Sequence, residues 1–106
     1  MPLIRYIYRP TGEAIVIIPA IVLMEVLYLF EKNRIEIGLL QTEVLMESRN
    51  YRFEPLSFGI LKTASNIDDI PELHDRLIAA TAKYLDLPMI TNDPVVIQSS
   101  FVRILQ

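Results

Sequence analysis

The sequence contains no cysteine among its 106 residues. Disulfide bonds, thiolate catalysis and metal sites built on cysteine are therefore excluded, and a cytoplasmic location is favoured. An excess of positive charge is also absent, because 10 Lys and Arg stand against 13 Asp and Glu for a net charge of −3. No overall positive field would attract a nucleic acid, so any RNA contact must come from a local patch.

A long uninterrupted hydrophobic run is missing as well. Segment 14–30 is strongly apolar, but Pro19 and Glu25 interrupt it. A membrane span needs about 20 predominantly apolar residues, and a carboxylate near the bilayer centre is costly. We therefore expect a buried strand followed by a buried helix, and no membrane segment. The chain also lacks repeats and Gly/Ser linkers, which predicts a single domain over residues 1–106.

What the sequence does contain is a succession of strand and helix patterns. Strands are expected at 3–8, 14–18, 51–56 and 89–91, and helices at 21–30, 35–49, 58–64 and 76–85. Only residues 9–13 separate the first two strands, which is too short for a parallel crossover and predicts an antiparallel hairpin at 3–18. The remaining alternation predicts an α/β fold with a mainly parallel sheet covered on both sides.

The hydrophobic content, 52%, predicts a stable core and apolar surface available to a partner. Helix 21–30 is apolar on nearly every face, so we expect other elements to cover it on several sides. Helix 35–49 has its apolar positions at Ile37, Leu40, Val44 and Leu45.

Three acidic residues are expected at one edge of the sheet. A helix starting at Asp75 descends about 16 Å by Leu85, and the strand that follows climbs back about as far, so Asp75 and Asp93 return to the same edge. Glu25 lies in the first two turns of the helix that follows strand 14–18, near that edge. Ligands of open parallel sheets bind outside the carboxyl ends of the strands, which is where these residues fall.

Converging carboxylates repel one another unless a cation lies between them, and oxygen ligands suit Mg²⁺ or Mn²⁺. Such an ion could activate water for phosphodiester hydrolysis. Thr91 and Asn92 could add hydroxyl or amide contacts to the substrate there.

Each of these residues also has a structural interpretation. Asp75 could be a helix N-cap or a first-turn acid, and Asp93 before Pro94 could be a turn residue. Glu25 would need a partner such as Lys32 or an arginine if it were buried. The loop acids Asp68 and Asp69 are expected to be exposed to solvent, and His74 is expected to help start a helix.

Segments 18–26, 75–82 and 88–93 together resemble PIN domains, in particular the toxins of toxin–antitoxin pairs. The most specific piece is Asp75 followed by Arg-Leu-Ile-Ala-Ala-Thr-Ala and then, after a short strand, Thr91-Asn92-Asp93. The resemblance covers about residues 14–106. It implies a three-layer α/β fold and an endoribonuclease that uses Mg²⁺ or Mn²⁺, is often a homodimer and is held inactive by an antitoxin.

The resemblance assigns catalytic and metal-binding roles to Glu25, Asp75 and Asp93, and substrate contacts to Thr91 and Asn92. The family also has an aspartate at the end of a first, central strand, whereas no aspartate precedes Asp68 here. The chain is thus similar to a PIN domain shortened at its N-terminus. Either segment 3–8 fills the place of the missing strand in the opposite direction, or another chain pairs there, and both outcomes favour a dimer.

Two functions follow from these patterns. The first is a PIN endoribonuclease whose remaining acids bind a divalent cation weakly, so that activity is impaired. The second is a non-catalytic PIN-like module that dimerises or binds a partner protein through apolar surface.

Overall fold

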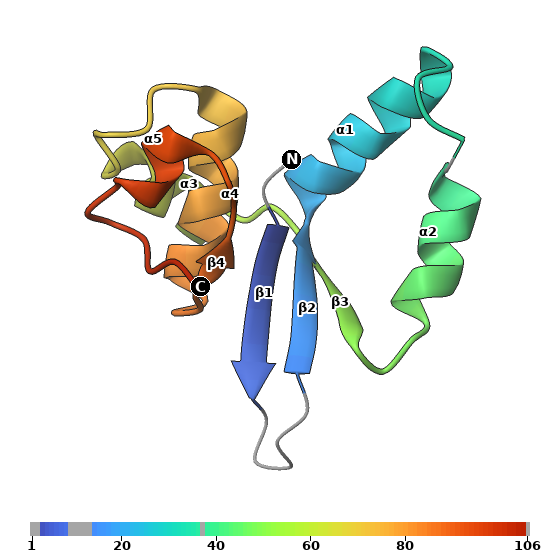
Figure 1. Cartoon of the computed structure of the whole chain (residues 1–106), viewed down its shortest axis with the longest axis horizontal. Helices are drawn as coiled ribbons and strands as arrows, with labels where there is room; N and C mark the ends of the chain where they lie inside the picture. The colour runs from blue at the N-terminus through green and yellow to red at the C-terminus, as the bar shows by residue number, and fades with distance from the viewer. Residues whose placement is uncertain (1–2, 9–13, 37, 106) are drawn as a thin grey trace.

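The computed structural model of the chain describes residues 3–8, 14–36 and 38–105 (Figure 1). Its strands are β1 (Leu3–Tyr8), β2 (Ala14–Pro19), β3 (Tyr51–Glu54) and β4 (Met89–Ile90). Its helices are α1 (Ala20–Glu31), α2 (Leu39–Met46), α3 (Phe58–Ser65), α4 (Leu73–Tyr84) and α5 (Pro94–Ile97).

The strands form one sheet in the order β3-β2-β1-β4. β1 is antiparallel to both of its neighbours, with Ile4 opposite Ile17 on β2 and opposite Met89 on β4. β2 and β3 are parallel, with Val16 opposite Tyr51. Consequently β2, β3 and β4 all run in one direction, and the predicted α/β fold, with an antiparallel hairpin at its start, is confirmed. The predicted turn at 9–13 lies outside the described residues.

The position of β1 answers how the sheet closes. Of the two alternatives that the sequence left open, the first holds, because β1 lies between β2 and β4 and pairs with both (Figure 1). The hairpin makes this possible, since a strand that turns back after a short loop pairs beside the strand it came from. The interior of the sheet is therefore paired within one chain.

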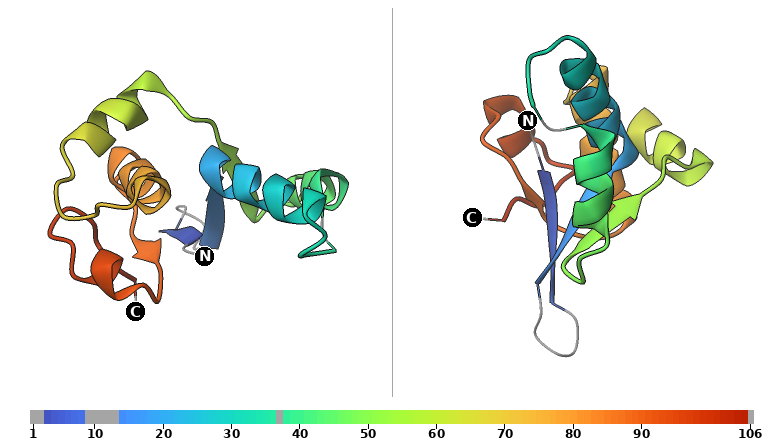
Figure 2. Two further views of the ribbon diagram at one scale, coloured as in Figure 1. Left: turned by 90° about the horizontal axis from the view of Figure 1, so that it is seen from above. Right: turned by 90° about the vertical axis from the view of Figure 1, so that its right-hand side faces the viewer.

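The core is formed mainly where α3 and α4 pack on the sheet. Its largest fully buried side chains are Ile60, Ile67, Ile70, Ile78, Met89, Val96 and Pro19. Ala79, Ala80 and Ala82 of α4 are also fully buried, and their small side chains let this helix lie close to α3 and β1. Figure 2 shows α3 and α4 on one side of the sheet and α5 on the other.

The expected covering of the helix at 21–30 on several sides is wrong. α1 buries only Ile21 and Val22, while Met24 and Tyr28 remain 49% and 56% exposed. α2 is shorter than expected, and within it only Thr42 is buried. Figure 1 shows the reason: α1 and α2 extend away from the half of the molecule that holds α3, α4 and α5, so little protein covers them. The expected apolar position at Ile37 lies outside the described residues.

The start of α4 also differs from the sequence interpretation. The helix begins at Leu73, and its N-cap is Glu72 rather than Asp75. Asp75 is therefore a first-turn acid, the second of its two structural interpretations. Among the described residues, no helix has the length and apolar character needed to cross a membrane.

Candidate functional site

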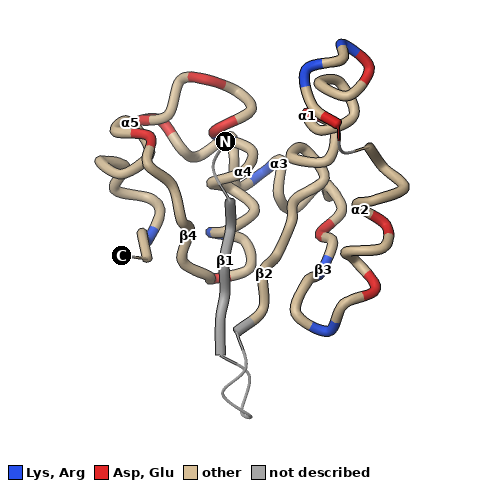
Figure 3. The backbone as a smooth tube through the Cα atoms, turned by 45° about the vertical axis from the view of Figure 1, so that its right-hand side comes forward, with Lys and Arg blue, Asp and Glu red and all other residues tan. Residues whose placement is uncertain are grey.

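The candidate site lies where β4 ends and α4 begins. Since β2 and β4 run in the same direction, their carboxyl ends meet at one end of the sheet. Asp93 follows β4, Asp75 lies in the first turn of α4, and Glu25 lies within the first two turns of α1. Figure 3 shows acidic segments near α5 and the start of α4, with further acidic segments at α1. The three predicted acids are thus on elements that reach the same end of the sheet.

Asp93 is fixed by a small network of hydrogen bonds. Its Oδ1 accepts hydrogen bonds from the backbone N–H of Val95, at 2.9 Å, and of Val96, at 3.4 Å, so it caps α5. Its own N–H donates to the hydroxyl of Thr91 at 3.0 Å. The Oδ2 atom makes no hydrogen bond to another described residue. One oxygen of this carboxylate therefore caps α5.

The carboxylate of Asp93 lies close enough to Asp75 to affect its pKa. The pKa of Asp75 is raised above its ordinary value, first because partial burial disfavours the ionised form and then because the carboxylates of Glu72 and Asp93 repel it. The nearby His74 acts in the opposite direction. Two residues that are 18 positions apart in sequence are thus brought into one electrostatic environment, as the edge argument predicts.

Glu72 belongs to this environment although sequence reasoning did not select it. Its Oε2 accepts the N–H of Asp75 at 2.7 Å, and its Oε1 lies 2.9 Å from Nδ1 of His74. Both contacts lower the pKa of Glu72, the backbone N–H of Asp75 having the larger effect. The sequence does place an acid, Glu72, three residues before Asp75, which is the spacing of a capping contact. Aspartate is the commoner capping residue, so Asp75 was predicted as the cap instead.

Glu25 differs from Asp75 and Asp93 in its contacts. Its side chain is partly buried and makes no hydrogen bond or ion pair to another described residue. The suggested partner Lys32 lies instead over the ring of Tyr28, 5.6 Å from its centroid. Because Glu25 is only partly buried, water can satisfy its carboxylate without a protein partner.

The other predicted residues surround Asp93 and Asp75. Thr91 is partly buried and its hydroxyl accepts a hydrogen bond from the N–H of Asp93, while Asn92 is exposed. His74 lies in the first turn of α4 and is exposed, as its structural interpretation expected.

The oxygen atoms of these side chains are suitable ligands for a hard divalent cation, but too few of them lie close together to form a complete site. Carboxylate and hydroxyl oxygens are the ligands that Mg²⁺ and Mn²⁺ prefer, and a cation between Asp75 and Asp93 would relieve their repulsion. However, across residues 3–8, 14–36 and 38–105 no three His, Asp or Glu side chains are close enough together to hold an ion. Asp75 and Asp93 are therefore the two predicted ligands that share one electrostatic environment in the structure.

The fold and this pair define an α/β domain with carboxylates gathered at the carboxyl end of its sheet. Residues 4–99 match the sequence pattern of the PIN domain family, and the chain belongs to that family, whose fold is of the nuclease type. The match begins earlier than the resemblance described above and includes most of β1. Comparison with curated proteins gave no match, and comparison with solved structures gave none either.

Proposed function

We propose that this chain is a PIN-type endoribonuclease scaffold that uses Mg²⁺ or Mn²⁺ and serves as the cytoplasmic toxin of a toxin–antitoxin pair, with impaired activity. The observation that carries the proposal is the convergence of Asp75 and Asp93, from different elements, at the carboxyl end of the sheet. The membership of the PIN family supports a nuclease reaction on RNA.

The roles of the residues follow from their positions. Asp75 and Asp93 would hold the cation, and Thr91 and Asn92 would contact the RNA. The resemblance also gives Glu25 a metal role, but Glu25 does not lie close enough to both of these acids to form a three-acid site with them. When bound, the cation activates water and neutralises charge on the phosphate. Because the capping bonds of α5 engage only Oδ1 of Asp93, its other oxygen can act as a ligand without breaking them.

Impaired activity follows from the number of acids. The PIN resemblance includes a fourth acid, an aspartate that ends a central strand. This sequence has no aspartate before Asp68. In this chain the central position is occupied by β1, which runs opposite to β2 and β4. With one fewer ligand we expect weak binding of the cation and slow cleavage.

A cleavage assay on single-stranded RNA with excess Mn²⁺ tests the proposal. We expect slow cleavage that a chelator stops and that Asp75→Asn and Asp93→Asn each abolish. Asp68→Asn is the matched control, because it removes the same charge from an exposed loop position. Absence of cleavage in the unmodified protein, together with a metal affinity that Asp93→Asn leaves unchanged, would reject the proposal.

A second candidate function is supported by the exposed face of α1 and α2. We define the α1–α2 surface as the exposed apolar side chains of these helices: Met24, Leu27, Tyr28, Phe30, Leu39, Leu40, Val44 and Leu45. Leu40 and Val44 are 78% and 68% exposed, which is unusual for aliphatic side chains on one short helix. Large exposed apolar patches commonly mark protein interfaces, and Leu27, Phe30, Leu39 and Leu40 of this surface line one pocket.

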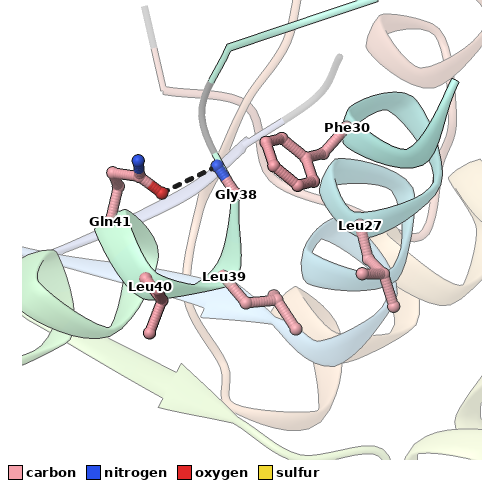
Figure 4. A pocket seen from close by; sticks show the side chains of 6 residues that line it. All are labelled: Leu27, Phe30, Gly38, Leu39, Leu40 and Gln41. Atoms are coloured by element: carbon pink, nitrogen blue, oxygen red, sulfur yellow. Dashed lines mark hydrogen bonds between the residues drawn. The ribbon is translucent and has the colours of Figure 1, made fainter. Parts of the chain in front are cut away.

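A pocket of about 290 Å³ opens within this surface (Figure 4). Its apolar wall is formed by Leu27 and Phe30 of α1 and by Leu39 and Leu40 of α2. Its polar side is closed by the Gly38 N–H, which donates to Oε1 of Gln41 at 3.0 Å. An apolar side chain from a second protein could enter the pocket, so we propose that homodimerisation or antitoxin binding uses the α1–α2 surface.

The size of the assembly in solution tests this candidate. Leu40→Glu with Val44→Glu should reduce the molecular mass measured by light scattering to that of a monomer, while the circular dichroism spectrum of the folded protein stays the same because neither side chain is in the core. Val95→Glu with Ile97→Glu is a control, since it adds the same two charges at exposed positions of α5, outside the surface. A protein that is already monomeric at micromolar concentration and purifies alone would argue against this function.

A further inference from the structure

Asp69 joins two segments that lie far apart in the sequence. It belongs to the loop between α3 and α4, and its Oδ1 accepts a hydrogen bond from the hydroxyl of Ser99 at 2.7 Å. Its Oδ2 accepts from the backbone N–H of Ser100 at 2.8 Å and from the Ser100 hydroxyl at 3.3 Å. Both oxygens of one carboxylate are thus committed to the segment just after α5.

The loop that carries Asp69 is itself firmly held. Ile67 and Ile70 on either side are each only 1% exposed. These core residues fix the backbone of the loop, so the Asp69 carboxylate is a rigid attachment point. The Ser99 hydroxyl that it binds also accepts the N–H of Phe101 at 3.1 Å, which extends the attachment into the C-terminal segment.

The attached segment is the one that presents Asp93. α5 is a single turn with Asp93 at its N-cap and Ser99 just beyond its C-cap. The Asp93 carbonyl accepts the N–H of Ile97 at 3.0 Å, and the Val96 carbonyl accepts that of Ser99 at 3.1 Å. The turn is anchored in the middle by the fully buried Val96. Hydrogen bonds within this single turn therefore connect Ser99 to Asp93.

We propose that Asp69 is a positioning residue, which holds the C-terminal end of α5 and thereby fixes the Asp93 carboxylate at the candidate metal site. The inference rests on the proposed function for its consequence, because Asp93 is a ligand only if the site binds a cation. The geometric part, from Asp69 through α5 to Asp93, stands without a cation. The same hydrogen bonds, that of the Ser100 N–H first, lower the pKa of Asp69, so its carboxylate is ionised at neutral pH.

Solvent exchange of the Val95 and Val96 amides, measured by NMR on the metal-free protein, tests the geometric part. Both amides donate to Oδ1 of Asp93. In Asp69→Asn we expect the exchange of these two amides to accelerate at least fivefold more than that of the buried Ile78 and Ala79 amides of α4, whose exchange reports only the change in global stability. Asp68→Asn, which removes the neighbouring exposed carboxylate, should change neither set.

A milder variant keeps the test decisive if Asp69→Asn does not fold. Ser99→Ala removes only the hydroxyl that donates to Oδ1 of Asp69, and should give the same change with smaller size, whereas Ser99→Thr keeps a hydroxyl and should restore the rates. Unchanged exchange at Val95 and Val96 in both Asp69→Asn and Ser99→Ala overturns the inference. A uniform acceleration that includes Ile78 and Ala79 also overturns it, since Asp69 would then serve stability alone.

Titration with Mn²⁺ separates this inference from the proposed function. If the unmodified protein binds Mn²⁺, Asp69→Asn should weaken the affinity by about tenfold, as outer residues that orient metal ligands commonly do. If the unmodified protein binds no Mn²⁺, the proposed function fails, and the amide exchange still decides whether Asp69 positions Asp93.

Discussion

Asp75 is a residue of the candidate site whose pKa is changed by its surroundings. Its carboxylate is partly buried, lies near Glu72 and Asp93, and has a raised pKa for those reasons. A group whose charged form is disfavoured gains from a bound cation, since the cation stabilises that form. The raised pKa shows that Asp75 interacts with Glu72 and Asp93, and its metal role, which the PIN resemblance implies, stays a prediction.

Replacement of Asp93 should be visible at Asp75. In Asp93→Asn one of the repelling carboxylates is gone, so we expect the pKa of Asp75 to fall toward the ordinary aspartate value of about 3.9. It should stay above that value because burial and Glu72 still act. Titration of the side-chain carboxyl carbon by NMR measures this, with Asp68→Asn as the control. An unchanged titration of Asp75 would mean that the two acids do not interact.

Sequence reasoning placed Asp75 and Asp93 correctly at one end of the sheet because helix rise and strand rise fix where a chain returns. It did not find Glu72, since a glutamate cap is less common than an aspartate cap. It also expected Asp69 to be an exposed loop acid, which is wrong. Asp69 is partly buried, and its partners Ser99 and Ser100 lie 30 and 31 residues further along the chain. Contacts at that separation leave no local pattern.

At the scale of the elements, the hairpin of β1 and β2 was predictable and the exposure of α1 and α2 was not. The length of the connection alone limits two neighbouring strands to antiparallel pairing. The burial of a helix depends instead on what packs against it, and an apolar sequence cannot show whether the covering protein is another element of the same chain. The α1–α2 surface is the result.

This difference between the helices predicts two very different mutational effects. Ile78→Ala in α4 removes a fully buried side chain, so we expect the free energy of unfolding to fall by about 2–5 kcal/mol. Leu40→Ala in α2 removes a side chain that is mostly in water, and we expect a change of less than about 0.5 kcal/mol. Urea denaturation of both variants at low protein concentration measures these values. Similar losses in the two variants would show that α2 is covered by protein.

At the scale of the whole molecule, the bonds from Asp69 tie the loop before α4 to the C-terminal segment. The pKa of Asp69 is lowered in the folded protein, so its ionised form stabilises the fold above the unfolded-state pKa of about 3.9. This contribution disappears as the pH falls through the lower, folded-state pKa.

Asp69→Asn should therefore lower the melting temperature at pH 7, and the difference from the unmodified protein should shrink as the pH falls below about 4. Thermal unfolding followed by circular dichroism between pH 7 and pH 3 measures the difference. Asp68→Asn should follow the unmodified protein across this range. A difference that grows on acidification would contradict the role of the ionised Asp69 carboxylate.

At the scale of the whole molecule, we propose that β4, α4 and α5 together position Asp75 and Asp93 so that both can bind one cation. Titration with Mn²⁺, followed by paramagnetic broadening of the backbone NMR signals, tests it most directly because it shows both whether the ion binds and where. We predict that the amides of Asp75, Thr91 and Asp93 broaden first, and that Asp93→Asn abolishes this local broadening while Asp68→Asn preserves it. Broadening that is absent, or that survives unchanged in Asp93→Asn, would contradict the claim.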